Sequence, residues 1–275
     1  MEDLTDLIET WPVESAAVGV TGPAETLGLG GDPEWRTRTA SVSKLLVGLC
    51  ALVAMEAETI ALDEPAGPEG STVEHLLAHT SGLAFDSDRM LAIPGRRRIY
   101  SNTGIEAFVD HLEQKAGMSF EDYLHIGVCE PLGMAATELR GSPAHAVHSH
   151  VADLLRFARE VMLPTLISRE TRDDALRPHF PGLPGVLPGV GSFDPNPWGL
   201  TCEVRGDKRP HWTGDANSPA TVGHFGGVGT FLWFDPEVDL AVVALTNREF
   251  GPWALDTWPR FSDAILKRFG TGSKF

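Results

Sequence analysis

One long apolar run limits what this chain can fold into. The run from Leu45 to Met55 is interrupted only by a glycine and a cysteine. This length predicts a fully buried helix rather than a strand, and it is too short for a membrane span, which needs about 20 residues. Lys44 directly precedes the run and is the only charged residue between Thr39 and Met55. Because a lone charge on a buried helix must find a partner or lose its proton, we expect Lys44 to have a specific role.

Ser41 lies three residues before Lys44, at the start of this predicted helix. Residues three apart share one helix face, so the Lys44 amino group can reach the Ser41 hydroxyl. A serine hydroxyl is a weak nucleophile that needs a nearby base, and a helix N-terminus favours developing negative charge. The alternative is a chance S-x-x-K pattern with Lys44 on a solvated helix face. The absence of other charges around Lys44 favours an activated Ser41.

Charge and cysteine content narrow the possible functions. The 275 residues include 22 basic and 38 acidic side chains, a net charge of -16. This charge disfavours nucleic-acid binding, because phosphates would be repelled, and the basic run at residues 96–98 is too short to offset it. Three widely separated cysteines without a C-x-x-C pattern indicate reduced thiols. The N-terminus is acidic and lacks the apolar stretch of a signal peptide, so we expect a cytoplasmic protein that binds no membrane.

The order of predicted elements indicates an α+β fold. Strand-like runs occur near both ends of the chain, at residues 16–20, 26–29, 199–204, 228–234 and 240–246. Helical patterns lie mainly between them, at residues 73–79, 105–115, 119–128, 151–162 and 168–176, with short and long terminal helices at 4–10 and 253–269. Residues 85–99 and 181–198 have loop composition. We therefore predict one antiparallel sheet domain from residues 1–60 and 178–275, flanked by helices, and an inserted helical domain at residues 61–177.

A second candidate stretch is Tyr100-Ser101-Asn102, in a loop just before a predicted helix. A phenol beside a lysine ammonium and a helix N-terminus is pulled toward phenolate and could serve as a general base. The amide of Asn102 offers both a donor and an acceptor, which suits it to orienting an amide substrate or holding Lys44. The alternative is a surface tyrosine followed by a helix cap.

A third stretch is rich in glycine and begins with His224-Phe225-Gly226-Gly227. Glycine in a strand usually marks a bulge or a close approach of another backbone. A substrate could pair along such an edge, and a glycine N–H could bind an oxyanion. The alternative is a flexible hairpin with an exposed His224.

Taken together, the three stretches resemble the serine β-lactamase and penicillin-binding protein superfamily. Its motifs are S-x-x-K, Y-x-N and K-T-G or H-x-G, and here they read Ser41 to Lys44, Tyr100 to Asn102 and His224 to Gly226. The resemblance extends over residues 16–269 and is greatest to the class C-like branch of esterases, D-aminopeptidases and D-Ala-D-Ala carboxypeptidases. It implies a β-lactamase/transpeptidase-like fold without a metal or cofactor.

The resemblance also implies roles for the candidate residues. Ser41 would be the nucleophile, and Lys44 and Tyr100 would share proton transfer. The N–H groups of Ser41 and Gly227 would form the oxyanion hole, and Asn102, His224 and Gly226 would line the substrate site. Penicillin-processing members have lysine where this chain has His224, whose charge at pH 7 is at most partial. This difference disfavours β-lactam hydrolysis and favours small esters or amides.

Other motifs carry less weight. His145, His148 and His150 are close in sequence, but their spacing fits no single helix face, and we interpret them as a surface loop rather than a metal site. His75 and His79 lack the glutamate of an H-E-x-x-H motif and are interpreted as structural. We expect a serine hydrolase that acts on a small-molecule ester or amide through an acyl-enzyme. An acyltransferase and a catalytically silent binding or regulatory protein are the alternatives.

Overall fold

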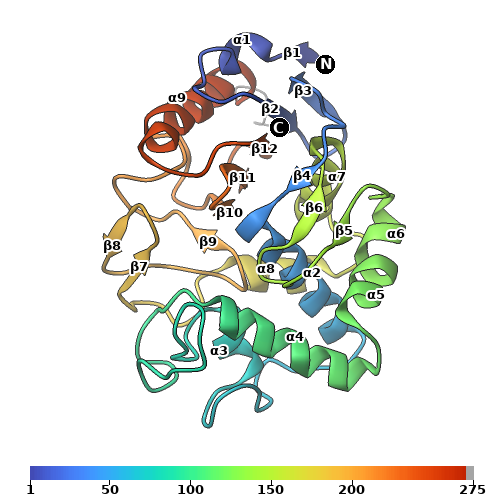
Figure 1. Ribbon diagram of the computed structural model, residues 1–275, viewed down its shortest axis with the longest axis vertical. Helices are drawn as coiled ribbons and strands as arrows, with labels where there is room; N and C mark the ends of the chain where they lie inside the picture. The colour runs from blue at the N-terminus through green and yellow to red at the C-terminus, as the bar shows by residue number, and fades with distance from the viewer. Residues whose placement is uncertain (271–275) are drawn as a thin grey trace.

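The computed structural model describes residues 1–270 and contains a seven-stranded sheet, which lies mostly in the upper half of the view in Figure 1. The strand order is β1-β3-β2-β12-β11-β10-β9. Neighbouring strands are antiparallel except β1 and β3, which are parallel. The strands are β1 (Glu2–Asp3), β2 (Ala16–Thr21), β3 (Thr26–Gly30), β9 (Glu203–Val204), β10 (Val222–Gly226), β11 (Thr230–Asp235) and β12 (Leu240–Thr246). Both ends of the chain therefore contribute to one mostly antiparallel sheet, which confirms the predicted α+β class.

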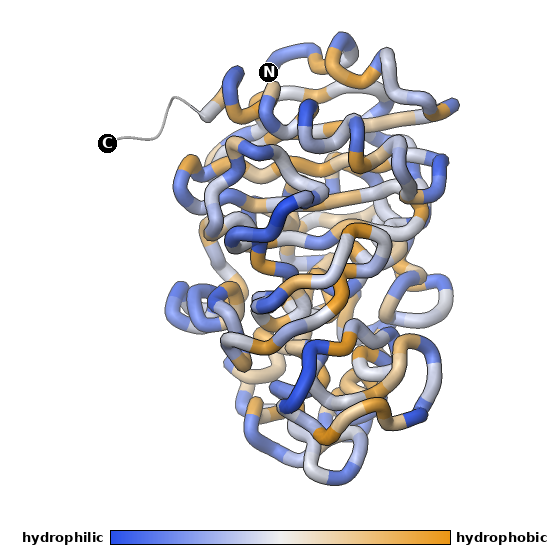
Figure 2. The backbone as a smooth tube through the Cα atoms, turned by 90° about the vertical axis from the view of Figure 1, so that its left-hand side faces the viewer, coloured by the Kyte–Doolittle hydropathy of each residue, from blue (hydrophilic) through white to orange (hydrophobic). Residues whose placement is uncertain are grey.

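Alternate side chains of each central strand enter different cores, because successive residues of a strand point to opposite faces. In β12, Val243 packs with one core and Val242 with the other. The first core lies between the sheet, α2 (Ser43–Glu56) and α7 (Val151–Met162). The second lies under α9 (Pro252–Phe269) and α1 (Thr5–Ile8). Figure 2 shows pale and orange segments running across the interior of the molecule, with many of the blue segments at its edges.

Most of the remaining elements are short. The helices are α3 (Val73–Leu77), α4 (Asn102–Ala116), α5 (Phe120–Leu124), a π-helical segment (His125–Cys129), α6 (Glu130–Leu132) and α8 (Arg169–Leu176). Two small sheets are formed by β4 (Thr37–Arg38), β5 (Glu138–Leu139) and β6 (Val147–Ser149), and by β7 (Gly185–Leu187) and β8 (Gly191–Phe193). The predicted strand at 199–204 is reduced to β9, and the predicted loop at 181–198 contains the β7–β8 hairpin. Elements of two or three residues are too short to produce a readable hydrophobic period.

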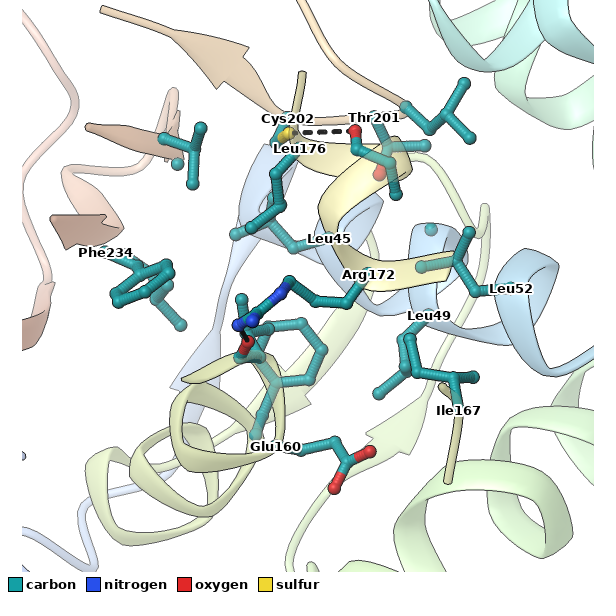
Figure 3. Close-up of a pocket in the computed structure, with 18 residues that line it drawn as sticks. Leu45, Leu49, Leu52, Glu160, Ile167, Arg172, Leu176, Thr201, Cys202 and Phe234 are labelled. Carbon is teal, nitrogen blue, oxygen red and sulfur yellow. Dashed lines mark hydrogen bonds between the residues drawn. The ribbon is translucent and has the colours of Figure 1, made fainter. Parts of the chain in front are cut away.

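The apolar run forms the buried helix predicted for it. Residues of α2 from Ser43 to Leu52 are buried. Behind the helix, Leu45, Leu49 and Leu52 face a small apolar cavity of about 50 Å³ between α2, α7 and α8 (Figure 3). Apolar neighbours on all sides explain why the helix shows no polar face.

The division into two domains stays a prediction, and the last five residues of the predicted sheet domain lie outside the described part of the chain. One helix of the predicted insertion, α7, packs directly against β2 and β12. Within residues 1–270 no helix combines the length and apolar character needed to cross a membrane.

Candidate active site

Ser41 lies in a tight turn that the end of β10 holds in place. A single 3₁₀ turn, Ala40–Val42, leads directly into α2, and Ala40 has a φ of 48° in the left-handed region. Thr230 Oγ1 at the start of β11 donates a hydrogen bond to the carbonyl of Thr39 at 2.7 Å. A Cβ on Gly226 would lie 2.6 Å from the same carbonyl oxygen. Only glycine allows this close approach, so Gly226 brings β10 against the Ser41 turn.

Lys44 is fully buried and directed at Ser41. Its Nζ lies 3.4 Å from Ser41 Oγ and donates hydrogen bonds to Asn102 Oδ1 at 2.6 Å and to the Ala144 carbonyl at 2.8 Å. Burial lowers the pKa of Lys44 to about 7, although the negative charges of Asp86 and Glu106 oppose this shift. A lysine with this pKa is partly unprotonated at neutral pH and can accept the proton of a serine hydroxyl.

Tyr100 lies beside Lys44 but is not a phenolate. The Lys44 ammonium is 4.8 Å from the centre of the tyrosine ring. Burial raises the pKa of Tyr100 above its usual value, an effect that the nearby Ser41 hydroxyl only partly offsets. The hydroxyl is buried and completes no hydrogen bond of ordinary geometry within residues 1–270. The expectation that the surroundings pull Tyr100 toward phenolate is therefore wrong, because loss of solvation outweighs them.

Asn102 holds Lys44 through an amide that is itself held by Asp86. The side-chain nitrogen of Asn102 donates to Asp86 Oδ1 at 2.7 Å, which leaves Oδ1 of Asn102 for Lys44. Asn102 is buried in the first turn of α4, and both ends of its amide are used within the protein. Asp86 was not a candidate in the sequence because it lies in a loop without a pattern, and only its proximity to Asn102 reveals it.

His224 is a buried, neutral side chain. Its Nδ1 lies 2.7 Å from the carbonyl of Phe225, so Nδ1 carries the proton and donates. Its Nε2 is then an acceptor, and it has no partner within residues 1–270. Burial, together with the nearby charge of Lys44, lowers the pKa of His224 to about 3. The rings of Tyr100 and Trp198 lie 5.5 and 5.4 Å from its ring. His224 thus offers no positive charge to a substrate at neutral pH.

A cavity of about 250 Å³ opens in front of Ser41. It brings together four predicted residues, Ser41, Tyr100, His224 and Gly227, and the Gly227 N–H donates no backbone hydrogen bond within the described residues. Asn102 and Gly226 support this site from behind and do not line it. The cavity is completed by residues that the sequence did not single out, namely Phe85, Leu187, Pro188, Gly189, Phe225 and Phe250.

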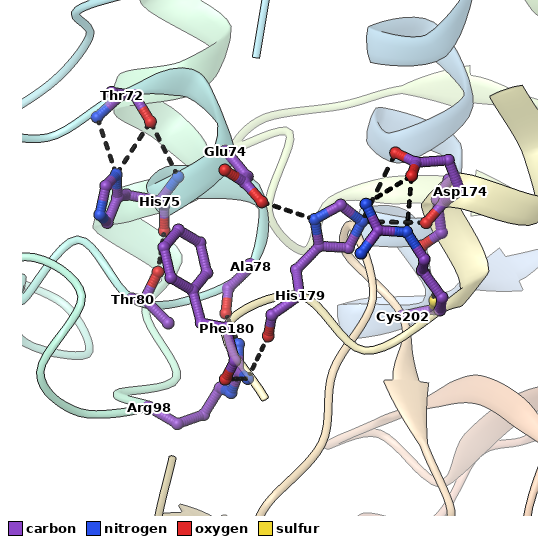
Figure 4. A network of polar contacts seen from close by, with 12 residues as sticks. Thr72, Glu74, His75, Ala78, Thr80, Arg98, Asp174, His179, Phe180 and Cys202 are labelled. Atoms are coloured by element: carbon purple, nitrogen blue, oxygen red, sulfur yellow. Dashed lines mark hydrogen bonds and ion pairs between the residues drawn. The ribbon is translucent and has the colours of Figure 1, made fainter. Parts of the chain in front are cut away.

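Arg98 fixes the loop that carries Tyr100. This buried guanidinium donates to the carbonyls of Ala78, His179, Phe180 and Asn196 (Figure 4). These carbonyls belong to segments far apart in the sequence, and together they satisfy a buried cation without a carboxylate. Of the basic run, Arg98 is therefore an internal support, whereas Arg96 and Arg97 are exposed.

The other histidines have structural positions. Thr72 caps α3, and the His75 ring completes the capping box by accepting from the Thr72 N–H. The ring of His79 packs 4.7 Å from that of Tyr100, so both histidines agree with the structural interpretation. The surface-loop interpretation is wrong for His148, which lies in β6; His150 lies between β6 and α7 and caps α7. No group of three or more His, Cys, Asp or Glu side chains suited to a metal ion occurs in residues 1–270.

Comparisons with known proteins agree with this arrangement. Residues 10–266 match the family described as Beta-lactamase. A crystal structure of a β-lactamase from Mycobacterium bovis is 50% identical, with a TM-score of 0.95 and coverage of 96% of this chain and 98% of that chain. No curated protein sequence matches the chain.

More distant structures share the fold. A mutant of simvastatin synthase from Aspergillus terreus has 18% identity and a TM-score of 0.80, with 98% of each chain covered. EstCE1, a hydrolase with promiscuous acyltransferase activity, has 18% identity and a TM-score of 0.76, with 94% of this chain and 95% of that chain covered. With a family match over nearly its whole length, the chain belongs to the β-lactamase family.

Proposed function

We propose that this protein is a serine hydrolase that cleaves a small ester or amide through an acyl-enzyme on Ser41. The observation that carries the proposal is the buried amino group of Lys44, 3.4 Å from Ser41 Oγ, with a pKa lowered to about 7. A general base is most effective when its pKa is near the working pH. Family members are typically serine hydrolases, which supports the same chemistry.

In the proposed reaction, neutral Lys44 accepts the hydroxyl proton of Ser41 while Oγ bonds to the substrate carbonyl carbon. The N–H groups of Ser41 and Gly227 stabilise the oxyanion. The raised pKa keeps Tyr100 protonated until this stage. Its hydroxyl can therefore donate a proton to the leaving group as the bond to the carbonyl carbon breaks. The proton on Lys44 then restores the Tyr100 hydroxyl. Water releases the acid in a second step that uses the same groups.

The cavity in front of Ser41 favours an uncharged acyl group. Among the described residues, none of the side chains that line it carries a charge at neutral pH, since His224 is neutral. A carboxylate placed there would lose its hydration without gaining an ionic partner. Acyl transfer to an alcohol is a second candidate, favoured by the shared fold with simvastatin synthase and EstCE1.

The test is covalent labelling of Ser41. Intact-mass measurement after reaction with a fluorophosphonate should give one adduct that maps to Ser41. The adduct should be lost in Ser41→Ala and kept in Ser15→Ala, a change at an exposed serine. Short-chain p-nitrophenyl esters, D-amino acid amides and nitrocefin, each tested with and without added alcohol, then separate hydrolysis from transfer. A full adduct on Ser41→Ala would contradict the proposal.

A further inference from the structure

A second cavity adjoins the one in front of Ser41. It has a volume of about 330 Å³, and the two cavities share Phe85, Tyr100 and Pro188 as lining residues. Common walls make them neighbouring parts of one cleft. Together they are in the size range of small-molecule sites in proteins, which is roughly 300–1,000 Å³.

The second cavity is lined by large apolar side chains that remain exposed. Phe85 is 47% exposed, Leu91 is 44% exposed and Val186 is 53% exposed. Met90 and Ile93, in the same loop, are also exposed. Single exposed apolar residues are ordinary, but a group of them around a cavity indicates a binding surface.

Two segments that are far apart in the sequence form this surface. One is the loop before α4, and the other is the β7–β8 hairpin, which lies beside that loop in Figure 1. The N–H of Arg98 donates to the Pro184 carbonyl at 3.1 Å, and Arg98 pairs with Gly185 in a bridge. The position of Val186 opposite the loop is therefore set by backbone contacts.

The polar groups around this cavity are engaged elsewhere, buried or exposed to water. The Arg98 guanidinium is used by backbone carbonyls, and the Tyr100 hydroxyl is buried. Arg97 is exposed and can keep its hydration at the rim. The cavity thus offers a ligand mainly apolar contact.

We propose that this second cavity is a subsite for an apolar group, an alkyl chain or an aromatic ring, of the substrate whose carbonyl reacts at Ser41. The inference rests on the proposed function and adds a substrate class to it. Each methylene that becomes buried in the subsite should raise kcat/KM by about fourfold, from the usual gain of burying a methylene. The apolar group belongs to either the acyl or the leaving group, and the experiment distinguishes the two.

The experiment compares kcat/KM in two series of esters. p-Nitrophenyl acetate and p-nitrophenyl octanoate differ in the acyl group. Methyl acetate and octyl acetate, followed by acid release, differ in the leaving group. Wild-type protein should prefer the long chain by at least tenfold in one of the two series, which identifies the side that enters the subsite. Val186→Ser and Leu91→Ser should each lower this preference by about threefold or more, with acetate turnover changed less than twofold. Ile126→Ser, at an equally exposed apolar residue outside both cavities, is the matched control.

Binding to Ser41→Ala separates failure of the subsite from failure of the proposed function. Calorimetric titration with p-nitrophenyl octanoate or octyl acetate should show binding that Val186→Ser weakens and Ile126→Ser does not. If this binding is observed but the wild-type protein hydrolyses none of the esters, the hydrolase proposal is contradicted and the subsite proposal is supported. Turnover of acetate esters without a chain-length preference, or equal effects of Val186→Ser and Ile126→Ser, would overturn the subsite.

Discussion

Burial acts in opposite directions on the two side chains proposed to transfer protons. It disfavours the charged form of each group, so it lowers the pKa of Lys44 to about 7 and raises that of Tyr100. The result at neutral pH is a partly unprotonated amine next to a neutral phenol. One physical cause therefore prepares both a base for Ser41 and an acid for the leaving group.

The first prediction concerns pH. For a neutral ester, kcat/KM should rise with pH through about 7, because only unprotonated Lys44 accepts the Ser41 proton. Below this value the rate should fall about tenfold per pH unit. At higher pH it should stay level, because the raised pKa of Tyr100 keeps its proton in place.

Two variants test the assignment of this midpoint. Asp86→Asn removes a negative charge that raises the pKa of Lys44, so the midpoint should move to lower pH. Lys44→Arg should lose roughly 10²–10⁴-fold in rate, because a guanidinium does not release its proton. A midpoint that is the same in Asp86→Asn and wild type would remove Lys44 from the proposed role of base.

At the scale of elements, a buried polar network supports the strand that carries His224. Glu203 in β9 pairs with Gly223 of β10. Its carboxylate accepts from Lys208 at 2.5 Å, His211 at 2.9 Å and Trp212 at 2.5 Å. Burial alone would raise the pKa of Glu203, but Lys208 and His211 outweigh it and hold the pKa below its usual value. The network fixes residues 203–213 against the edge of the sheet.

The prediction at this scale is a loss of stability in Glu203→Gln. Breaking a buried ion pair by removing one partner costs about 3–5 kcal/mol, because the other charge stays buried. Urea unfolding at pH 7 should show this loss, while the exposed control Glu237→Gln should change stability by less than about 0.5 kcal/mol. The depressed pKa makes the contribution of Glu203 present above about pH 4.3 and lost as the pH falls further. A loss below about 1 kcal/mol at pH 7 would contradict this account.

At the scale of the whole molecule, we expect charge to disfavour anionic substrates. The net charge is -16, and the described residues around Ser41 place no charged side chain in its cavity. Long-range repulsion slows the encounter with an anion, and salt screens that repulsion. We expect neutral esters to be hydrolysed faster than nitrocefin, and added salt to raise kcat/KM for nitrocefin only.

The contribution of His224 is tested by comparing neutral esters with nitrocefin in His224→Lys. A lysine could supply a charge-assisted hydrogen bond worth about 1.5–3 kcal/mol, or one to two decades in kcat/KM for nitrocefin. The neutral ester should be affected little, because Ser41, Lys44 and Tyr100 are unchanged. Faster hydrolysis of nitrocefin than of every neutral ester by the wild-type protein would show that this view of specificity is wrong.

Local patterns in the sequence were enough for the main elements and for one part of the site. The apolar run determines a buried helix, and the continuous apolar run of β12 indicates a strand with two buried faces. The spacing of Ser41 and Lys44 places both on one helix side, because that relation depends only on helix geometry. The helix, the strand and the shared side of Ser41 and Lys44 do not depend on which residues bury them.

Tertiary structure alone decided the electrostatics and the walls of the site. The neutrality of Tyr100 and His224 follows from burial by neighbours distant in the sequence, and the orientation of Asn102 follows from Asp86 in an unpatterned loop. A pKa depends on which groups and how much water surround an atom in space. The cavity beside Ser41 likewise exists only where Phe85 and the β7–β8 hairpin meet, which no local pattern records.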